Sequence, residues 1–250
     1  MRVFLILLRR ELGSYFGSLT GYSIIAAVLV LLGLSFIEIL SKLNVEATEA
    51  PVTELFFVTA YFWIILLLST PMITMRLFAL EKFSGTYETL MTTPVLDWEV
   101  VLSKFTGALL FYLVTWTPLL GYLLLVRQYS NGPVVLNAWV LACTFLGLLL
   151  IGSVYIALGC FASALTRSQI VAAMISYALG IGLFLVSLRA LTSAPLTGWA
   201  GNALKYLSMT EHMADFARGV VDTRAFILYI SLTILFLFLT AKVVESRRWR

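Results

Sequence analysis

Six long apolar runs dominate this chain and decide which solvent it folds in. Of its 250 residues, 61% are hydrophobic and 12% are charged, whereas a soluble globular domain has about 25% charged residues. A helix of roughly 20 mostly apolar residues is long enough to cross a bilayer. The runs are Thr20 to Leu40, Leu55 to Met75, Thr106 to Val126, Ala138 to Ala162, Ile170 to Leu188 and Ala225 to Val243. The sequence therefore predicts an all-α membrane protein with six transmembrane helices in a single domain, residues 1–250.

Lys and Arg residues fall unequally on the two sides of the predicted spans. Six spans place both termini on one side, and that side carries most of the 17 Lys and Arg residues. Loops rich in Lys and Arg stay in the cytoplasm, so we expect both termini there. Because these residues are spread over several loops and form no continuous basic face, the net charge of +4 gives no indication of nucleic-acid binding.

Several motifs for catalysis and binding are missing from the sequence. No GxxxxGK[ST] phosphate-binding loop occurs, so we expect this chain to have no catalytic residues and to bind no ATP. One histidine, His212, and two cysteines, Cys143 and Cys160, do not have the spacing of a metal site, and we interpret His212 as a solvated or capped loop residue. The second to fifth predicted spans contain no Asp, Glu, Lys or Arg, and the sixth contains only Lys242 next to its last residue, which argues against an ion-coupled carrier.

Residues 1–17 have the pattern of a basic helix that lies on the membrane surface. Arg9 is on its polar side, and Arg10 follows. Glu11, in contrast, falls in the middle of the apolar side, where a carboxylate needs a partner. We expect Glu11 to pair with a cation on another helix or on another subunit.

Residues 76–104 form a polar segment between the second and third spans that is much longer than a turn requires. Treated as a helix that starts at Leu80 and ends before Pro94, it has two distinct sides. The apolar side contains Leu80, Phe83, Tyr87, Leu90 and Met91, and the polar side contains Glu81, Ser84, Gly85, Glu88 and Thr92. Two interpretations remain open: a helix that another protein pulls, or an interfacial helix that only anchors the loop.

Small residues recur in the fourth span, where they let helices approach closely. They are Gly147, Gly152, Ser153, Ala157, Gly159 and Ser163. We favour packing inside the bundle over an interface between subunits.

Residues 189–224, between the fifth and sixth spans, are too few for a folded domain and too many for a hairpin. Apolar residues recur at helical spacing between Glu211 and Val221, and Thr210 is a candidate N-cap. We expect one or two short amphipathic helices at the outer surface, including a segment that returns into the membrane.

Three sequence stretches resemble the membrane subunits of ABC-2 type transporters. The first is E-K-x-S-G-T-x-E-x-L-x-x-x-P at residues 81–94, followed by W-E-V-V-L-x-K-F at 98–105. The others are R-R-E-L-x-S-Y-F at residues 9–16 and E-H-x-x-D-F-A-R-G-V-x-D at residues 211–222. Within this family the chain looks most like the gliding-motility-associated and copper-cluster-maturation permeases. The resemblance covers nearly the whole chain.

The resemblance implies a permease of the bacterial inner membrane that has no catalytic residues of its own, because a separate ATPase subunit would hold ATP and Mg²⁺. Two permeases, identical or related, would pair and dock two such ATPases through a coupling helix, whose residues would be Glu81, Lys82, Ser84, Gly85, Thr86, Glu88, Leu90 and Pro94. The interfacial helix would contribute Arg9, Arg10 and Glu11, and the outer segment Glu211, His212, Asp215, Arg218 and Asp222.

Export driven by the ATPase is the function that we expect first. The alternative is a subunit that transmits ATP-driven motion to an outer-facing companion protein without moving a solute, as in a gliding-motility machine. A channel or carrier that works without ATP is the third candidate, and the uncharged spans argue against it.

Overall fold

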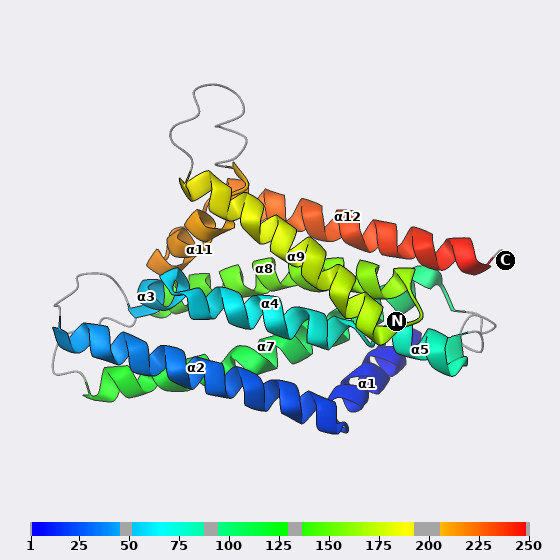
Figure 1. Ribbon diagram of the computed structural model, residues 1–250, viewed down its shortest axis with the longest axis horizontal. Helices are drawn as coiled ribbons and strands as arrows, with labels where there is room; N and C mark the ends of the chain where they lie inside the picture. The colour runs from blue at the N-terminus through cyan, green and yellow to red at the C-terminus, as the bar shows by residue number, and fades with distance from the viewer. Residues whose placement is uncertain (1, 46–51, 88–94, 130–136, 193–205, 249–250) are drawn as a thin grey trace.

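The computed structural model describes residues 2–45, 52–87, 95–129, 137–192 and 206–248. These parts of the chain are helical, and the longer helices lie side by side along one axis of the molecule (Figure 1). The helices are α1 (Arg2–Phe16), α2 (Leu19–Val45), α3 (Val52–Val58), α4 (Ala60–Thr74), α5 (Ala79–Ser84), α7 (Asp97–Tyr129), α8 (Ala138–Leu165), α9 (Gln169–Thr192), α11 (Met209–Arg218) and α12 (Thr223–Arg248). The predicted all-α fold is confirmed.

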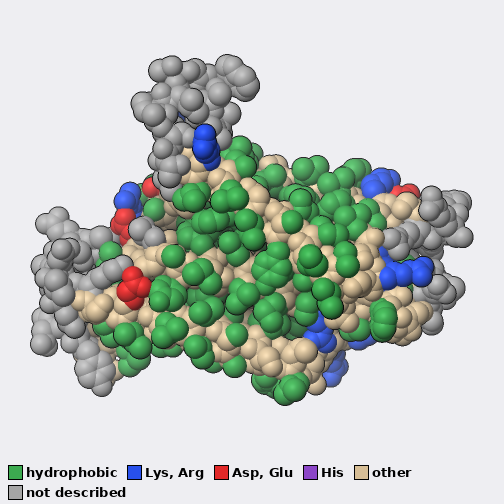
Figure 2. Space-filling view, in the orientation of Figure 1, with side chains coloured by type: hydrophobic (Ala, Val, Ile, Leu, Met, Phe, Trp, Pro, Cys, Tyr) green, Lys and Arg blue, Asp and Glu red, His purple; other side chains and the backbone are tan. Residues whose placement is uncertain are grey.

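Within the described ranges, six helical segments are long and apolar enough to cross a membrane, as the sequence predicts. They are Leu19–Ser41, Ala60–Ser84, Asp97–Val126, Ala138–Leu165, Gln169–Arg189 and Thr223–Ser246. The start of α1 and the end of α12 lie at the same end of the bundle as α5 (Figure 1). Hydrophobic side chains cover the middle of the face seen in Figure 2, and charged side chains gather toward the two ends.

The second span differs from its prediction, because the helix expected over Leu55 to Met75 is interrupted at Thr59. The backbone of Thr59 is extended, with φ −72° and ψ 151°, and separates α3 from α4. Its hydroxyl donates a hydrogen bond to the carbonyl oxygen of Phe56 at 2.6 Å. The backbone N–H of Thr59 donates to the same carbonyl oxygen at 3.2 Å, so Thr59 caps the last turn of α3 with two hydrogen bonds.

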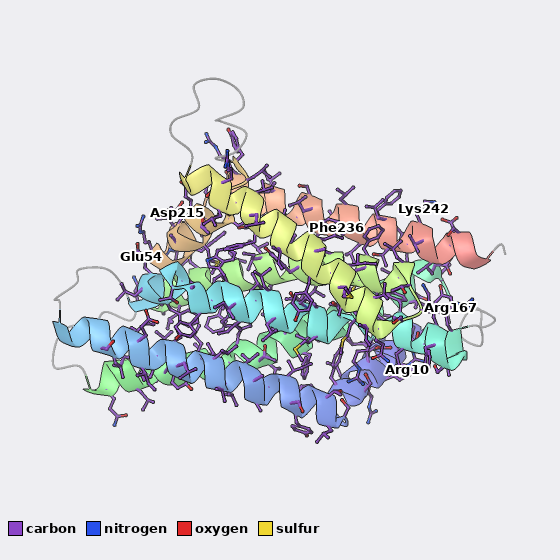
Figure 3. All side chains as sticks on the ribbon, in the orientation of Figure 1. Arg10, Glu54, Arg167, Asp215, Phe236 and Lys242 are labelled. Carbon is purple, nitrogen blue, oxygen red and sulfur yellow. The ribbon has the colours of Figure 1, made fainter. Side chains whose placement is uncertain are left out.

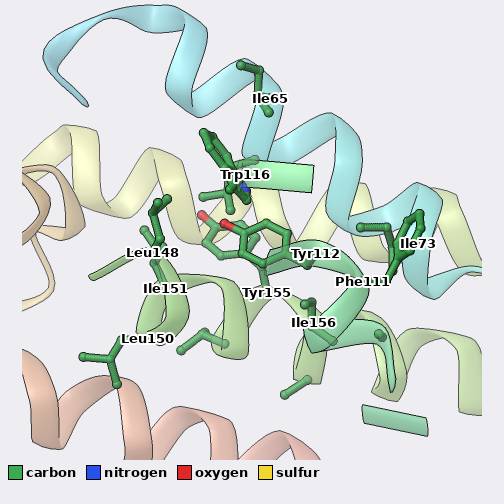
Figure 4. Packing of buried hydrophobic residues seen from close by; sticks show 14 of the residues in the cluster. Ile65, Ile73, Phe111, Tyr112, Trp116, Leu148, Leu150, Ile151, Tyr155 and Ile156 are labelled. Atoms are coloured by element: carbon green, nitrogen blue, oxygen red, sulfur yellow. The ribbon is translucent and has the colours of Figure 1, made fainter. Parts of the chain in front are cut away.

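The centre of the bundle is α8, against which α4, α7, α9, α11 and α12 all pack. Figure 4 shows Tyr112 of α7 beside the part of α8 that carries Ile151 and Tyr155. Ser153 of α8 and Thr233 of α12 are joined by a hydrogen bond of 3.0 Å between their hydroxyls. Each of these two hydroxyls also lies within hydrogen-bond distance of a carbonyl oxygen of its own helix, Leu150 for Ser153 and Tyr229 for Thr233, so both have partners at membrane depth.

The small residues of α8 lie at the points of closest approach, which confirms the expected packing inside the bundle. An ideal Cβ at Gly152 would lie 2.2 Å from a ring carbon of Tyr112, and one at Gly159 would lie 2.1 Å from the hydroxyl oxygen of Thr74. Hydrogen is therefore the only side chain that these two contacts accommodate without a shift of the neighbouring helix.

We predict that Gly159→Ala destabilises the fold by about 1–3 kcal/mol, because the added methyl group overpacks the contact with Thr74. The midpoint of thermal unfolding in mild detergent measures the effect. Gly121→Ala is the matched control, since a Cβ at this position in α7 meets nothing within 4 Å. Equal unfolding midpoints for the two variants would contradict the prediction.

Candidate functional site

The polar segment after the second span begins with α5, which is shorter than the helix that the sequence predicts. It ends at Ser84, and Gly85 follows in the left-handed conformation with φ +76°. A glycine in this conformation ends a helix without the steric cost that other residues meet. The prediction of an unbroken helix from Leu80 to Pro94 is therefore wrong. Three predicted coupling residues lie outside the described residues: Glu88, Leu90 and Pro94.

The charged side of α5 faces the bundle, and part of its apolar side faces outward. Lys82 is buried, and the side chain of Glu81 is 17% exposed. Phe83, in contrast, is 78% exposed, and Ser84 and Thr86 are also exposed. Glu81, one of the predicted coupling residues, has its carboxylate paired within the chain.

Glu81 belongs to an ion cluster with Arg10, Glu11 and Lys104, named here the Lys104 cluster. Lys104 Nζ lies 2.9 Å from Glu11 Oε1 and 2.9 Å from Glu81 Oε1. Arg10 Nη2 lies 2.8 Å from Glu81 Oε1 and 3.2 Å from Glu11 Oε1. The cluster therefore joins α1, α5 and α7 through two cations and two carboxylates.

Burial makes the pairing of Lys104 necessary. Its side chain is 2% exposed, and a buried ammonium without an opposite charge is costly. Glu11 is also nearly buried, whereas Arg10 is 49% exposed and closes the cluster toward the surface. The expectation that Glu11 meets a cation on another helix is confirmed, and this cation is Lys104.

A second set of contacts attaches α5 to the end of α8. Ser163 Oγ accepts hydrogen bonds from the backbone N–H groups of Phe78 and Ala79, both at 3.1 Å. Lys82 Nζ donates to the carbonyl oxygen of Ala164. Carbonyl groups in the last turn of a helix lack intrahelical partners, and a cation there also interacts favourably with the helix dipole. The charge of Lys82 therefore holds α5 on α8.

The connection before α5 is tied to α1 and α2 as well. Arg76 donates to the hydroxyls of Ser18, at 3.3 Å, and Thr20, at the start of α2. The hydroxyl of Tyr15 in α1 donates to the carbonyl oxygen of Ile73 at 2.9 Å. A cavity of about 210 Å³ lies between the Lys104 cluster and Arg76. A displacement of α5 would thus act directly on α1, α2, α7 and α8.

Sequence reasoning did not identify Lys104 and Ser163 as site residues. Lys104 entered the sequence analysis only as one of the Lys and Arg residues outside the predicted spans. Its position directly before the apolar third span could have identified it as a buried cation, which needs carboxylates as partners. Ser163 belonged to the small-residue pattern of the fourth span. Its role as a hydrogen-bond acceptor depends on the position of α5, and the spacing of small residues in the fourth span gives no information about that position.

The predicted outer residues lie at the opposite end of the bundle from α5. Figure 3 labels Asp215 and Glu54 at that end and Arg10 at the other. Arg218 Nη2 lies 2.5 Å from Glu54 Oε1 and its other nitrogen 3.9 Å from Asp215. Asp222 Oδ1 accepts from the N–H of Arg224 at the start of α12, and Glu211 is exposed. These residues stabilise local structure and do not converge on one cluster.

The interpretation of His212 as a solvated or capped loop residue is wrong. His212 lies within α11, is 9% exposed, and packs edge-to-face on Tyr229 of α12 with ring centroids 5.8 Å apart. The helix starts at Met209, and its N-cap is Ser208 rather than Thr210. Burial lowers the pKa of His212, and the nearby carboxylates of Asp222, Asp215 and Glu211 oppose this shift.

We predict that Lys104→Met destabilises the fold by about 3 kcal/mol, because it leaves two nearly buried carboxylates with only Arg10 as a cation. Thermal unfolding in detergent is the measurement. Lys242→Met removes an exposed pair with Glu245 and should cost less than about 1 kcal/mol. Adding Glu11→Gln and Glu81→Gln to Lys104→Met should restore much of the stability, and a further loss would contradict the proposed pairing.

We also predict a pH-dependent contribution of His212 to stability. Since its pKa is lower in the folded state, the unfolded chain takes up the proton first as the pH falls below the ordinary value of 6.5. The stability from neutral His212 is therefore present above that value and is lost in acid. The unfolding midpoint should fall more between about pH 7.5 and about pH 5.5 for the wild type than for His212→Gln. Equal falls would refute the prediction.

Comparison with known protein families matches residues 40–247 to the family described as ABC-2 family transporter protein. The match covers well over half of the chain and includes α4, α5, α7, α8, α9, α11 and nearly all of α12. A search of curated proteins finds no match.

Proposed function

The chain belongs to the ABC-2 family of transporter proteins, and we propose that it is the permease subunit of an ATP-driven exporter in the bacterial inner membrane. Its six candidate spans support a membrane pathway. The second to fifth apolar runs are uncharged, and the sixth contains only Lys242 next to its last residue, which supports a pathway without an ion-coupled site. ATP and Mg²⁺ would bind to a separate ATPase subunit, and two permease chains, identical or related, would form the pathway. The distribution of Lys and Arg supports cytoplasmic termini and therefore a cytoplasmic α5.

The observation that carries the proposal is the attachment of α5 to the spanning helices. Ionic contacts join it to α1 and α7 through the Lys104 cluster, and Lys82 and Ser163 join it to α8. A helix attached only to lipid head groups would not make these contacts. Movement of α5 by a closing ATPase would therefore displace several helices at once, which is what coupling by a conformational change requires.

The same geometry divides the roles within the coupling segment. Glu81 and Lys82 are bound inside the chain and would transmit motion, whereas Phe83 projects outward and would seat in the ATPase. Ser84, Gly85 and Thr86 surround it with exposed small and polar groups, which suits the rim of an interface around an apolar anchor. We propose that Phe83, rather than a carboxylate, is the main anchor of this contact.

The outer segment would close the other end of the pathway. Met213 and Phe216 of α11 are buried, and a Cβ at Gly147 of α8 would lie 2.9 Å from Phe216. The pair of Arg218 and Glu54 then fixes α11 to α3. Exposed Glu211 is available to an outer-facing companion protein.

We predict that Phe83→Ala weakens the complex with the ATPase subunit by about 30-fold, the loss expected for a central aromatic anchor. Co-purification from membranes and binding of the separately purified ATPase measure the effect. Leu19→Ala is the control, because Leu19 is exposed to a similar extent, 84%, but lies at the start of α2. Unchanged binding by Phe83→Ala would refute the proposed anchor.

Glu81→Gln separates docking from transmission in the same assay. It should retain ATPase binding and lose export of an amphiphilic substrate, because one partner of Lys104 is neutralised while Phe83 stays exposed. Failure of every purified ATPase subunit to bind the wild-type chain would overturn the proposed function. ATP hydrolysis that responds to an outer protein but to no solute would instead favour a subunit that transmits motion.

A further inference from the structure

An apolar groove with a volume of about 670 Å³ runs along the outside of the bundle between α1, α7 and α8. This volume is in the range of sites that bind small molecules, roughly 300–1,000 Å³. Its lining is apolar except for Thr117, whose hydroxyl donates to the carbonyl oxygen of Val114 at 2.7 Å. The described lining therefore offers no free hydrogen-bond donor, and hydrocarbon is the ligand chemistry that fits it.

We infer that this groove binds one acyl chain of an anionic phospholipid whose head group lies beside α1. The groove starts at α1 and runs along α7 from Leu110 to Leu120 and along the first half of α8, which leads away from the chain termini. Ten residues of helix rise about 15 Å, which is half of the roughly 30 Å hydrocarbon thickness of a bilayer. One acyl chain has this reach, whereas a spanning helix of a second copy is about twice as long.

The position of α1 places the lipid head group. Leu12 and Phe16 of α1 line the groove near Leu110, and Phe16 also packs on Phe111 with ring centroids 5.4 Å apart. This contact sets the end of the groove that lies nearest to the chain termini. A lipid chain in the groove therefore has its head group beside α1.

Arg9 supplies the charge complementarity for an anionic head group. It precedes Leu12 by three residues and Phe16 by seven, so all three lie on the same face of α1. Arg9 is exposed and has no ion pair among the residues that the structure describes, whereas neighbouring Arg10 is held by Glu11 and Glu81. A basic residue at the membrane surface next to an apolar groove attracts a phospholipid head group whose net charge is negative.

The test uses the full chain, purified in mild detergent and depleted of lipid, with native mass spectrometry to count bound lipid. The probes are phosphatidylglycerol and phosphatidylcholine with identical acyl chains. The wild type should bind phosphatidylglycerol about fivefold more tightly, the effect of one basic residue at the surface. Arg9→Gln should remove this preference and leave the binding of phosphatidylcholine unchanged.

Substitutions at two valines, Val114 and Val186, test the groove itself. Val114→Trp, inside the groove, should weaken the binding of both lipids about tenfold because the ring occupies the space of the chain. Val186→Trp in α9 is the matched control, since Val186 is 40% exposed and Val114 is 41% exposed. It should bind both lipids like the wild type. Val114→Phe is a smaller change at the same position. Its lipid binding and its unfolding midpoint, measured in parallel, distinguish filling of the groove from misfolding.

Three results would overturn the inference. Equal losses of lipid binding in Val114→Trp and Val186→Trp would show that lipid contacts the whole surface and not the groove in particular. A preference for phosphatidylglycerol that survives in Arg9→Gln would show that another residue supplies the positive charge. A wild-type dimer that Val114→Trp dissociates would show that a second copy occupies the groove. Because no ATPase or nucleotide is present, the result does not depend on the proposed transport function.

Discussion

The pairing of the Lys104 ammonium with the carboxylates of Glu11 and Glu81 is the contact on which one end of this bundle depends. A cation that is 2% exposed requires opposite charge at contact distance, and both carboxylates lie 2.9 Å away. The ion pairs that satisfy Lys104 hold α1 and α5 against α7, although these three helices are separate in the sequence. Arg10 then balances the second carboxylate and leaves the cluster without net charge. The electrostatic requirement of one side chain thus determines the placement of two helices.

Within the spans, close packing has to replace the hydrophobic effect, because lipid is as apolar as the helix surfaces themselves. Gly152 and Gly159 let Tyr112 and Thr74 approach α8, and the hydroxyl pair of Ser153 and Thr233 joins α8 to α12. Since α5 is bound to the end of this same central helix, a force on α5 reaches the best-packed part of the molecule. An interior of this density moves as a body and does not absorb the displacement locally.

Residues 76–104 show why a helical wheel alone does not determine which side of a helix faces the bundle. Their periodicity separates apolar from polar residues, and the usual inference is that apolar residues face inward and carboxylates face a partner. Here the bundle provides Lys104 for Glu81 and the Ala164 carbonyl for Lys82, so the charges turn inward and Phe83 is left in the open. The apolar groove beside α1 extends this division, since Arg10 is bound internally while Arg9 on the next face remains available.

The sequence by itself determined the solvent, the fold class, the number of spans and the family, because each of these depends on the composition and spacing of residues close together in the chain. It also determined that Glu11 needs a cation and that the small residues of α8 face the interior. The tertiary structure alone decided that the cation is Lys104, that His212 is buried on Tyr229, and that the helices break at Thr59 and Gly85. These features depend on which distant backbone and charged groups come within a few ångströms, and local periodicity carries no information about that distance.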